Sequence, residues 1–254
     1  MSLSPVLTTP ARRLSAPDGE WAPNGLFALS DKDKQTILDF HKLFYDTIHW
    51  VRWFGAAIQK NPVDLWVYQE IIAVTQPDLL IEIGTNYGGS SVYFATLFEF
   101  MDNGHVITID TVEKEDRPRH ARLTQFIGDS VSPDIIERLK VDVRHYEKVM
   151  VVIDGDHDKD QVLKELELYA PLVSEGSYLV VEDTNLGHEV VPDWDGGPRE
   201  ALDEWLPSHP EFTVDARAEY LYLTYNPGGW LFKGQLKQPF VHPAIHSFTN
   251  PVKK

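Results

Sequence analysis

The sequence has no cysteine, no long apolar run and a deficit of basic residues, and each of these absences excludes a class of protein. Without cysteine the chain forms neither disulfides nor thiolate metal sites, which fits a reducing cytoplasm. No apolar run approaches the roughly 20 residues that span a bilayer, and residues 1–19 lack the apolar core of a signal peptide. The formal net charge of −16, with no basic patch, disfavours nucleic acid and anionic membranes as partners. We therefore expect a cytoplasmic protein that binds a small molecule.

What the chain does have is a regular alternation of short apolar runs and helical segments. Apolar runs typical of strands occur at 79–83, 105–110, 123–127, 149–154 and 177–182. Because a helical or partly helical stretch follows each run, we expect parallel strands with helices on both faces of the sheet. Residues 219–225 and 230–233 flank an Asn-Pro-Gly-Gly turn instead, which predicts an antiparallel hairpin. The predicted fold class is α/β, with a mostly parallel, Rossmann-like sheet of seven strands that ends in this hairpin.

The length of 254 residues suits one large domain flanked by less regular segments. Residues 1–27 contain four prolines and predict an extended arm, and a helix capped by Ser30 follows. Aromatic residues at 44–54 indicate either packing of this N-terminal layer or a subunit contact, so we expect a homo-oligomer. We divide the chain into an N-terminal extension at 1–60, a ligand-binding domain at 61–235 and a C-terminal arm at 236–254.

The stretch LLIEIGTNYGGSS at 79–91 is the central motif of the chain. A buried strand that ends in a glycine turn and a helix start suits a ligand site, because glycine admits close approach and the first helical turn has unpaired N–H groups. The pattern Glu82-x-Gly84-x-x-x-Gly88 differs from the G-x-G-x-x-G of dinucleotide enzymes. Its carboxylate would repel a pyrophosphate but tolerates the sulfonium and amino groups of S-adenosylmethionine. The alternative is a tight turn in an ordinary α/β domain. We assign cofactor binding to Glu82, Gly84, Thr85, Tyr87, Gly88 and Ser90.

Acidic residues follow the neighbouring strands, at the sheet edge where ligands of open parallel sheets bind. Asp110 follows the second strand and can accept both ribose hydroxyls of an adenosine. Asp129 and Ser130 follow the third strand and can reach the adenine edge. For both acids the alternative role is to cap the next helix.

Four carboxylates, those of Asp154, Asp156, Glu182 and Asp183, would meet at the ends of strands four and five. Without a cation they would repel one another and take up protons. Oxygen ligands suit a hard ion, Mg²⁺ first, with Ca²⁺ or Mn²⁺ possible, and our ligand set is Asp154, Glu182 and Asp183. Asp154 also borders the cofactor pocket. A metal there would acidify a substrate hydroxyl, and His157 is placed to accept the proton. The alternative for His157 is a hydrogen-bonded loop histidine.

Taken together, these motifs resemble those of the cephalosporin-hydroxylase family and the related macrolide-sugar and macrocin-type O-methyltransferases. The resemblance covers roughly residues 61–234 and is carried by NPxDLxxYQE at 61–70, IEIGTNYGGSS at 81–91, IDGDH at 153–157, VVED at 180–183, GPxxA at 197–201 and LTxNPxG at 223–229. It implies S-adenosylmethionine at the glycine turn and Mg²⁺ held by three acids. Class I methyltransferases of this kind also have the terminal hairpin that most dinucleotide folds lack.

The spacing of the acids carries the resemblance further. In the sugar methyltransferases the first acid lies 28 residues before the paired acids, as Asp154 does before Glu182, and a histidine matching His157 acts as base. Some relatives use a spacing of 26 residues, which selects Asp156 instead, so Asp156 remains an alternative ligand or base. The resemblance also implies roles in closing over cofactor or substrate for Lys60, Asp64 and Gln69.

The leading hypothesis is a Mg²⁺-dependent S-adenosylmethionine O-methyltransferase that acts on a hydroxyl of a small molecule or natural-product sugar. The alternatives are an accessory or hydroxylase-type protein that binds the same cofactor, a scaffold subunit that binds a cation, and a dehydrogenase, which the glycine spacing disfavours. The sequence shows no iron site of two histidines and a carboxylate. The loop at 184–197 is expected to be a lid. The aromatic residues Tyr87, Trp194 and Trp230 either line the acceptor pocket or serve packing.

Overall fold

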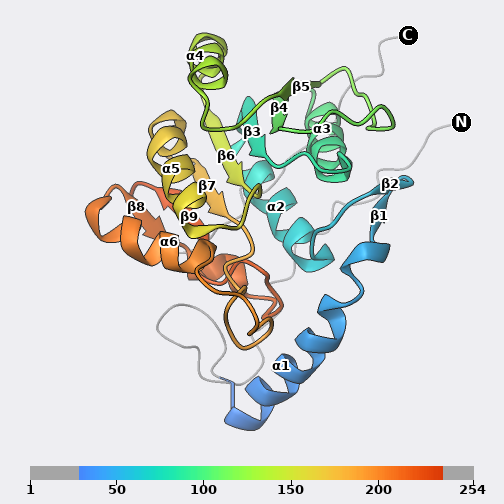
Figure 1. Cartoon of the computed structure of the whole chain (residues 1–254), viewed down its shortest axis with the longest axis vertical. Helices are drawn as coiled ribbons and strands as arrows, with labels where there is room; N and C mark the ends of the chain where they lie inside the picture. The colour runs from blue at the N-terminus through green and yellow to red at the C-terminus, as the bar shows by residue number, and fades with distance from the viewer. Residues whose placement is uncertain (1–28, 237–254) are drawn as a thin grey trace, which may run out of the picture.

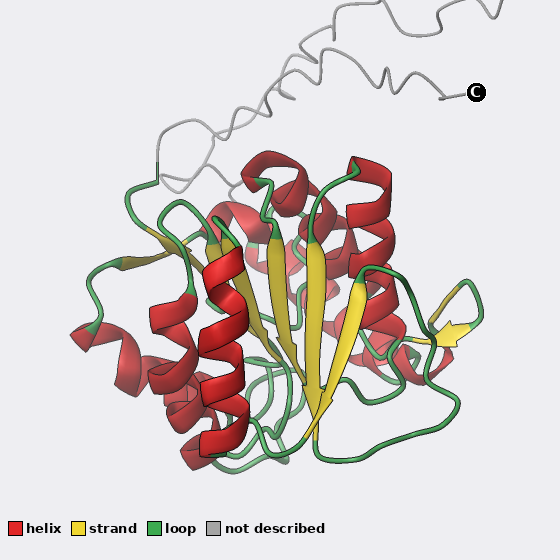
Figure 2. Ribbon diagram, turned by 90° about the horizontal axis from the view of Figure 1, so that it is seen from above, coloured by secondary structure: helices red, strands yellow, loops and turns green. Residues whose placement is uncertain are grey.

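The computed structural model describes residues 29–236, which form a large sheet with helices on both of its faces and a separate two-stranded sheet (Figures 1 and 2). The predicted N-terminal arm at 1–27 lies outside the described residues. So does the predicted C-terminal arm at 236–254, except for residue 236.

The sheet has seven strands in the order β5-β4-β3-β6-β7-β9-β8. In chain order they are β3 (Leu79–Ile83), β4 (His105–Asp110), β5 (Leu123–Ile127), β6 (Val149–Ile153), β7 (Tyr178–Val181), β8 (Phe212–Val214) and β9 (Trp230–Lys233). The first five are parallel, and β9 lies antiparallel to both β7 and β8. The predicted fold class is therefore confirmed.

Alternation along the central strands decides which helices cover which face. In β3, Leu79, Ile81 and Ile83 pack toward α4 (Pro133–Asp142), α5 (Lys159–Tyr169) and α6 (Pro198–Trp205). Leu80 points the other way, into the cluster formed with α2 (Pro62–Thr75) and α3 (Gly89–Met101). Because both faces are buried, nearly every position of these strands is apolar, which is why they read as continuous runs.

The predicted strand at 219–225 is wrong. The neighbour of β9 is β8 at Phe212–Val214, and Ala216–Glu219 is a 3₁₀ turn. The segment that was expected to be a strand is held by other groups: the Tyr225 N–H donates to Asp64 Oδ2 at 2.9 Å, and the Tyr225 carbonyl accepts from the Asn185 N–H at 3.1 Å. These tertiary hydrogen bonds replace the ladder that the alternating pattern predicted.

The partly helical stretch predicted after the second strand is also wrong, because residues 111–122 contain no helix. The carboxylate of Asp110 accepts from the Val112 N–H at 2.8 Å and from Arg117 at 2.7 Å. These contacts fold the connection back on the strand end, and Pro118 lacks the N–H that a helix interior requires.

The N-terminal layer begins with α1 (Asp31–Tyr45), and the Ser30 side chain caps it as predicted. This helix stands apart from the sheet in Figure 1, and His41 is its only buried residue. A 3₁₀ turn (Ile48–Trp50) and the short strands β1 (Arg52–Trp53) and β2 (Ala56–Ala57) follow. Trp53 packs edge-on against Tyr93, whereas Trp50 and Phe54 are exposed, so only part of the aromatic cluster serves packing.

Three further 3₁₀ turns follow α4, α5 and α6, at Val143–His145, Ala170–Leu172 and Leu206–Ser208. Within residues 29–236, none of the helices combines the length and the apolar character that a bilayer span needs.

Candidate active site

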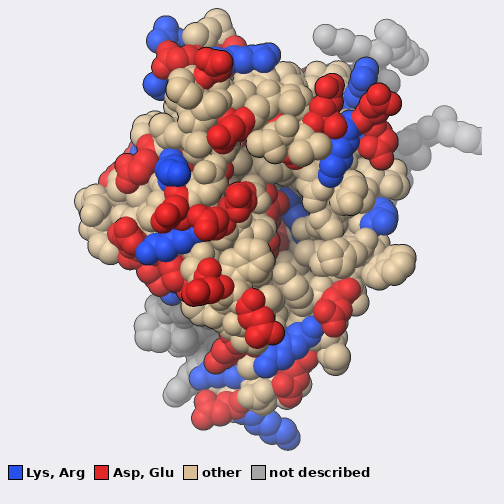
Figure 3. All heavy atoms as spheres, in the orientation of Figure 1, with Lys and Arg blue, Asp and Glu red and all other residues tan. Residues whose placement is uncertain are grey.

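A cavity of about 760 Å³ opens beyond the carboxyl ends of the parallel strands. Strand β3 lies between β4 on one side and β6 on the other, so the order of the strands in the sheet reverses at this point. Ligands of open α/β sheets bind at such a switch point. Figure 3 shows the recess near the middle of one face, with acidic and basic side chains next to each other inside it.

Most of the predicted site residues line this cavity. They are Gly84, Thr85, Tyr87, Ser90, Asp110, Asp129, Ser130, Asp154, Asp156, His157 and Asp183. Glu82, Gly88 and Glu182 do not line the cavity, whereas Lys60, which precedes α2, does.

The glycine turn has no room for side chains. Gly84 has φ +95°, and a Cβ there would lie 1.8 Å from the carbonyl oxygen of Asp154. Gly88, at φ +78°, precedes α3, and a Cβ at Gly89 would lie 2.1 Å from the carbonyl oxygen of Ala57. The backbone of the turn is therefore pressed against β6 and the β1–β2 hairpin, and the turn can approach a ligand closely.

Glu82 supports this turn from inside the protein. Its Oε2 accepts hydrogen bonds from the hydroxyls of Ser91 and of Thr108 on β4, the latter at 2.8 Å. Burial raises the pKa of Glu82, although Lys60 and these hydroxyls oppose the shift. The side chain thus joins β3, β4 and α3 below the cavity.

Helix capping explains neither Asp110 nor Asp129. Asp110 Oδ2 accepts from the Asn86 N–H and from Arg117, each at 2.7 Å, and no helix follows it before β5. Asp129 accepts from the Val131 N–H at 3.1 Å, while the N-cap of α4 is Ser132. The alternative that was considered for both acids is therefore wrong.

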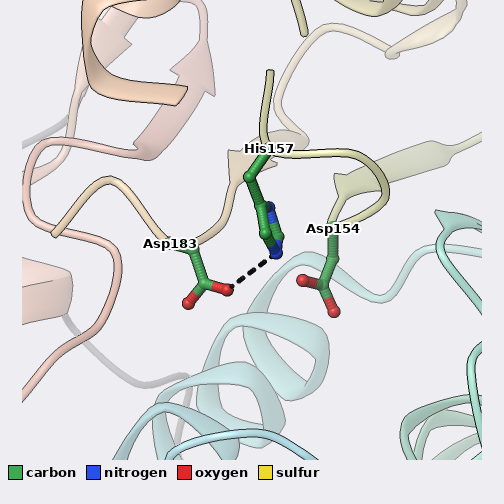
Figure 4. A group of neighbouring side chains, drawn as sticks. All are labelled: Asp154, His157 and Asp183. Carbon is green, nitrogen blue, oxygen red and sulfur yellow. Dashed lines mark ion pairs between the residues drawn. The ribbon is translucent and has the colours of Figure 1, made fainter. Parts of the chain in front are cut away.

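Asp154, His157 and Asp183 meet at the ends of β6 and β7 (Figure 4). One ligand atom of each lies within 4.8 Å of the others, and His157 Nε2 is 3.3 Å from Asp183 Oδ2. Asp183 adopts φ +54°, held by its N–H donating to Asn226 Oδ1 at 3.0 Å. Left-handed backbone at a non-glycine residue is often found at functional sites.

Glu182 faces a different partner. Its Oε1 accepts from Lys60 Nζ at 2.7 Å and from the Tyr68 hydroxyl, and Lys60 Nζ also lies 2.6 Å from Asp154 Oδ2. Among the described residues, the metal-type group therefore contains His157 rather than the predicted Glu182. The exposed Asp156 is outside this group too, with its Oδ1 accepting from the Asp158 N–H at 3.1 Å.

Burial and mutual repulsion make the ionisation of these acids less favourable. Burial and the nearby Asp154 raise the pKa of Glu182 to about 7, and burial raises that of Asp154 to about 6 despite Lys60. Burial alone would lower the pKa of Lys60, but Asp154 and Glu182 outweigh it and raise this pKa. A divalent cation beside Asp154, His157 and Asp183 would offset this repulsion, and the two carboxylates and the imidazole offer it suitable ligand atoms.

Sequence reasoning missed Gln161 and Glu165 of α5, which also line the cavity. A signal was present: Glu165 occupies the same helix face as the buried Val162, Leu166 and Tyr169, a position where an apolar side chain is expected. From the N-terminal layer, Tyr45 and His49 complete the wall.

Comparison with known proteins agrees with this geometry. The sequence model of the Rhamnosyl O-methyltransferase/CmcI family matches residues 45–234. The chain belongs to this family. The predicted resemblance, and with it the assignment to the methyltransferases, is therefore confirmed, and the dehydrogenase alternative is set aside.

Relatives with the name rhamnosyl O-methyltransferase cover most of the chain. The protein from Mycobacterium tuberculosis is 36% identical over 205 residues, which are 77% of this chain and 84% of that one. The protein from Mycobacterium leprae is 34% identical over 77% of this chain and 89% of its own length. Among solved structures, apo CmcI and CmcI with Mg and SAM have TM-scores of 0.57 and 0.56 at 20% and 21% identity. Each of the two matches covers 73% of this chain and 77% of the CmcI chain, which shows a shared fold.

Proposed function

We propose that the protein is a Mg²⁺-dependent O-methyltransferase that transfers the methyl group of S-adenosylmethionine to a hydroxyl on a sugar unit of a small molecule. The observation that carries the proposal is that a single cavity contains both the glycine turn and the Asp154, His157 and Asp183 group. The 36% identity to rhamnosyl O-methyltransferases over most of the chain supports the sugar acceptor.

The cofactor would lie across the glycine turn, with its ribose at Asp110 and its base near Asp129 and Ser130. Asp110 is fixed by Arg117 and the Asn86 N–H, so its carboxylate is oriented before a ligand arrives. Gly89 and Ser90, in the first turn of α3, line the same cavity, and the N–H groups of a first helical turn have no partner within the helix.

Asp154 and Asp183 would hold the Mg²⁺ ion, with oxygen ligands of the kind that this ion prefers. When bound, the ion supplies positive charge that lowers the pKa of a substrate hydroxyl. We assign Glu182 to the support of this site, since it orients Lys60, and Lys60 in turn fixes the Asp154 carboxylate.

His157 would accept the proton of the substrate hydroxyl at Nε2. The carboxylate of Asp183, 3.3 Å away, stabilises the imidazolium that results. Trp194 of the 184–197 loop contacts the His157 ring, with ring centroids 6.1 Å apart, and could exclude water once an acceptor is bound. Because no covalent intermediate with the protein is needed, positioning and electrostatics account for the catalysis.

An iron-dependent hydroxylase is disfavoured by the residues themselves. In the described part of the chain the metal-type group contains one histidine and two carboxylates, whereas the iron oxygenases use two histidines and one carboxylate.

Calorimetric titration of S-adenosylhomocysteine, with and without Mg²⁺, tests the proposal in wild type and in Asp183→Asn. Asparagine tolerates the left-handed backbone, so the variant should fold and bind S-adenosylhomocysteine while losing its Mg²⁺ affinity. Asp193→Asn, in the exposed lid, is the matched control and should behave as wild type. Absence of S-adenosylhomocysteine binding to folded wild type would overturn the proposal.

A further inference from the structure

Glu165 is a buried carboxyl group that the proposed chemistry does not use. It lies on α5, is 1% exposed and lines the same cavity as the glycine turn. A carboxyl group is almost never fully buried without partners, so its position requires an explanation.

The two oxygens of Glu165 have unequal surroundings. Oε1 accepts from the Ser130 hydroxyl at 2.6 Å and from Gln161 Nε2 at 3.3 Å. Oε2 is buried and has no hydrogen-bond partner in the part of the chain that the structure describes. The side chain is therefore fixed through one oxygen, while the other is a buried acceptor that no described donor satisfies.

No basic side chain among residues 29–236 pairs with this carboxyl group. The charged residues that act on it, Asp156 and Asp129, are acidic, and together with burial they raise the pKa of Glu165 to about 7. A structural ion pair is thus not the reason for its burial. A ligand N–H group would satisfy Oε2 without adding charge.

The surroundings of Glu165 suit the base of a nucleoside. Ser130, which holds Oε1, follows β5 at the position where we place the adenine. Gly155 keeps the approach open, since a Cβ there would lie 3.6 Å from Glu165 Oε1 and 3.0 Å from Ile83 Cγ2. A flat ring can therefore come against the Gly155 backbone and reach the carboxyl group with its edge.

We propose that Glu165 determines the specificity for adenine, with Oε2 accepting an N–H of the 6-amino group while Ser130 and Gln161 hold the carboxylate in place. This inference rests on the proposed function, because it requires the adenosyl cofactor in this cavity. Glu165 would discriminate against bases that have an oxygen at the 6-position, since two acceptor oxygens would then face each other.

The test compares the affinities of S-adenosylhomocysteine and S-inosylhomocysteine, measured by calorimetry. Wild type should prefer the adenosyl compound by about 10- to 100-fold, the range expected for a hydrogen bond to a charged group. In Glu165→Gln the amide can turn its nitrogen toward the cavity, so the preference should vanish or reverse. Glu167→Gln, the same change on an exposed position of the same helix, should keep the wild-type ratio.

Three results would overturn the assignment. The first is equal binding of both compounds by wild type, a result that needs no variant. The second is a Glu165→Gln variant with the wild-type ratio and unchanged affinities. The third is a variant that loses both affinities by the same factor, which would indicate a purely structural role. If wild type bound neither compound, the proposed function itself would fail, and this inference with it.

Discussion

Lys60 is the residue on which the arrangement of the acidic site depends most. Its ammonium group is buried and lies within 2.7 Å of both Asp154 and Glu182, whose own pKa values are raised by burial. A buried ion pair contributes little net stability, but removal of one partner leaves uncompensated charge behind.

We predict that Lys60→Met lowers the free energy of unfolding by about 3–5 kcal/mol near pH 8, because two buried acids lose their cation. The loss should be smaller near pH 5, where those acids take up protons. Urea unfolding followed by circular dichroism measures both values. Lys140→Met, in an exposed pair with Glu137, should cost less than about 1 kcal/mol. Equal losses in the two variants would contradict this account of Lys60.

Some residues of the site could be predicted from the sequence, and others could not. Asp110, Asp129 and Asp154 were predictable because each lies at the carboxyl end of a strand, and the carboxyl ends of parallel strands share one edge. The pairing of Lys60 with Glu182 was not, since it joins residues 122 positions apart through side-chain rotamers that no local pattern fixes. The only sign of Glu165 in the sequence is that an acidic residue occupies an otherwise apolar face of a helix.

At the scale of elements, the turn from β3 to α3 determines where a ligand can lie. Gly84 and Gly55 have similar positive φ angles, +95° and +89°, but different surroundings. A Cβ at Gly84 would meet the Asp154 carbonyl at 1.8 Å, whereas nothing lies within 4 Å of a Cβ at Gly55.

We therefore predict that Gly84→Ala destabilises the protein by at least about 2 kcal/mol more than Gly55→Ala, because overpacking adds to the cost of the left-handed backbone that both share. Thermal unfolding compares the two variants. Gly84→Ala should also lose S-adenosylhomocysteine binding, while Gly55→Ala retains it. Equal stability and equal binding of the two variants would show that the close approach of β3 and β6 is unimportant.

The 184–197 loop is the element that we expect to close over the acceptor. We predict that Trp194→Ala raises the KM for the acceptor several-fold and leaves the Kd of S-adenosylhomocysteine unchanged, because the Trp194 ring contacts His157 on the acceptor side. Steady-state kinetics and calorimetry separate the two effects. Trp50→Ala, at a side chain that is 80% exposed, is the control. A changed Kd with an unchanged KM would place Trp194 on the cofactor side instead.

Elements with a strong local pattern were predicted well, and the predicted strand at 219–225 shows what such a pattern leaves out. The five parallel strands follow from their apolar runs, and the start of α1 follows from the capping residue Ser30. The expected strand at 219–225 failed because Asp64 and Asn185 bind its backbone, and these contacts come from distant parts of the chain. Alternation predicts which residues suit a sheet, but not which groups form hydrogen bonds with their backbone in the folded protein.

At the scale of the whole molecule, buried acids should make stability depend on pH. The pKa values of Asp64, Glu165 and Glu182 are raised by burial to about 8, 7 and 7. Since the folded state binds these protons more tightly than the unfolded state, the stabilisation is complete at low pH and is lost as pH rises.

We predict that the free energy of unfolding of the metal-free protein falls between about pH 5 and about pH 8, by up to about 1.4 kcal/mol per pH unit for each such proton. Mg²⁺ should restore part of the lost stability near the upper end of this pH range, because the ion binds the folded state. Asp64→Asn should flatten the curve. Urea unfolding with and without Mg²⁺ measures this, and a stability that increased with pH over the same range would contradict the prediction.

The expected homo-oligomer remains a prediction. Trp50 and Phe54 are 80% and 90% exposed on the N-terminal layer that also brings Tyr45 and His49 to the cavity. Sedimentation analysis of the full chain would determine its state of assembly.

The central claim is methyl transfer to a sugar hydroxyl, and the product mass tests it most directly. The protein would be incubated with S-adenosylmethionine, Mg²⁺ and a rhamnoside, and the products analysed by mass spectrometry. We predict a gain of one methylene unit in the sugar, equal formation of S-adenosylhomocysteine, and loss of both when Mg²⁺ is chelated. A gain of one oxygen atom instead, or methylation that persists unchanged without the ion, would contradict the account.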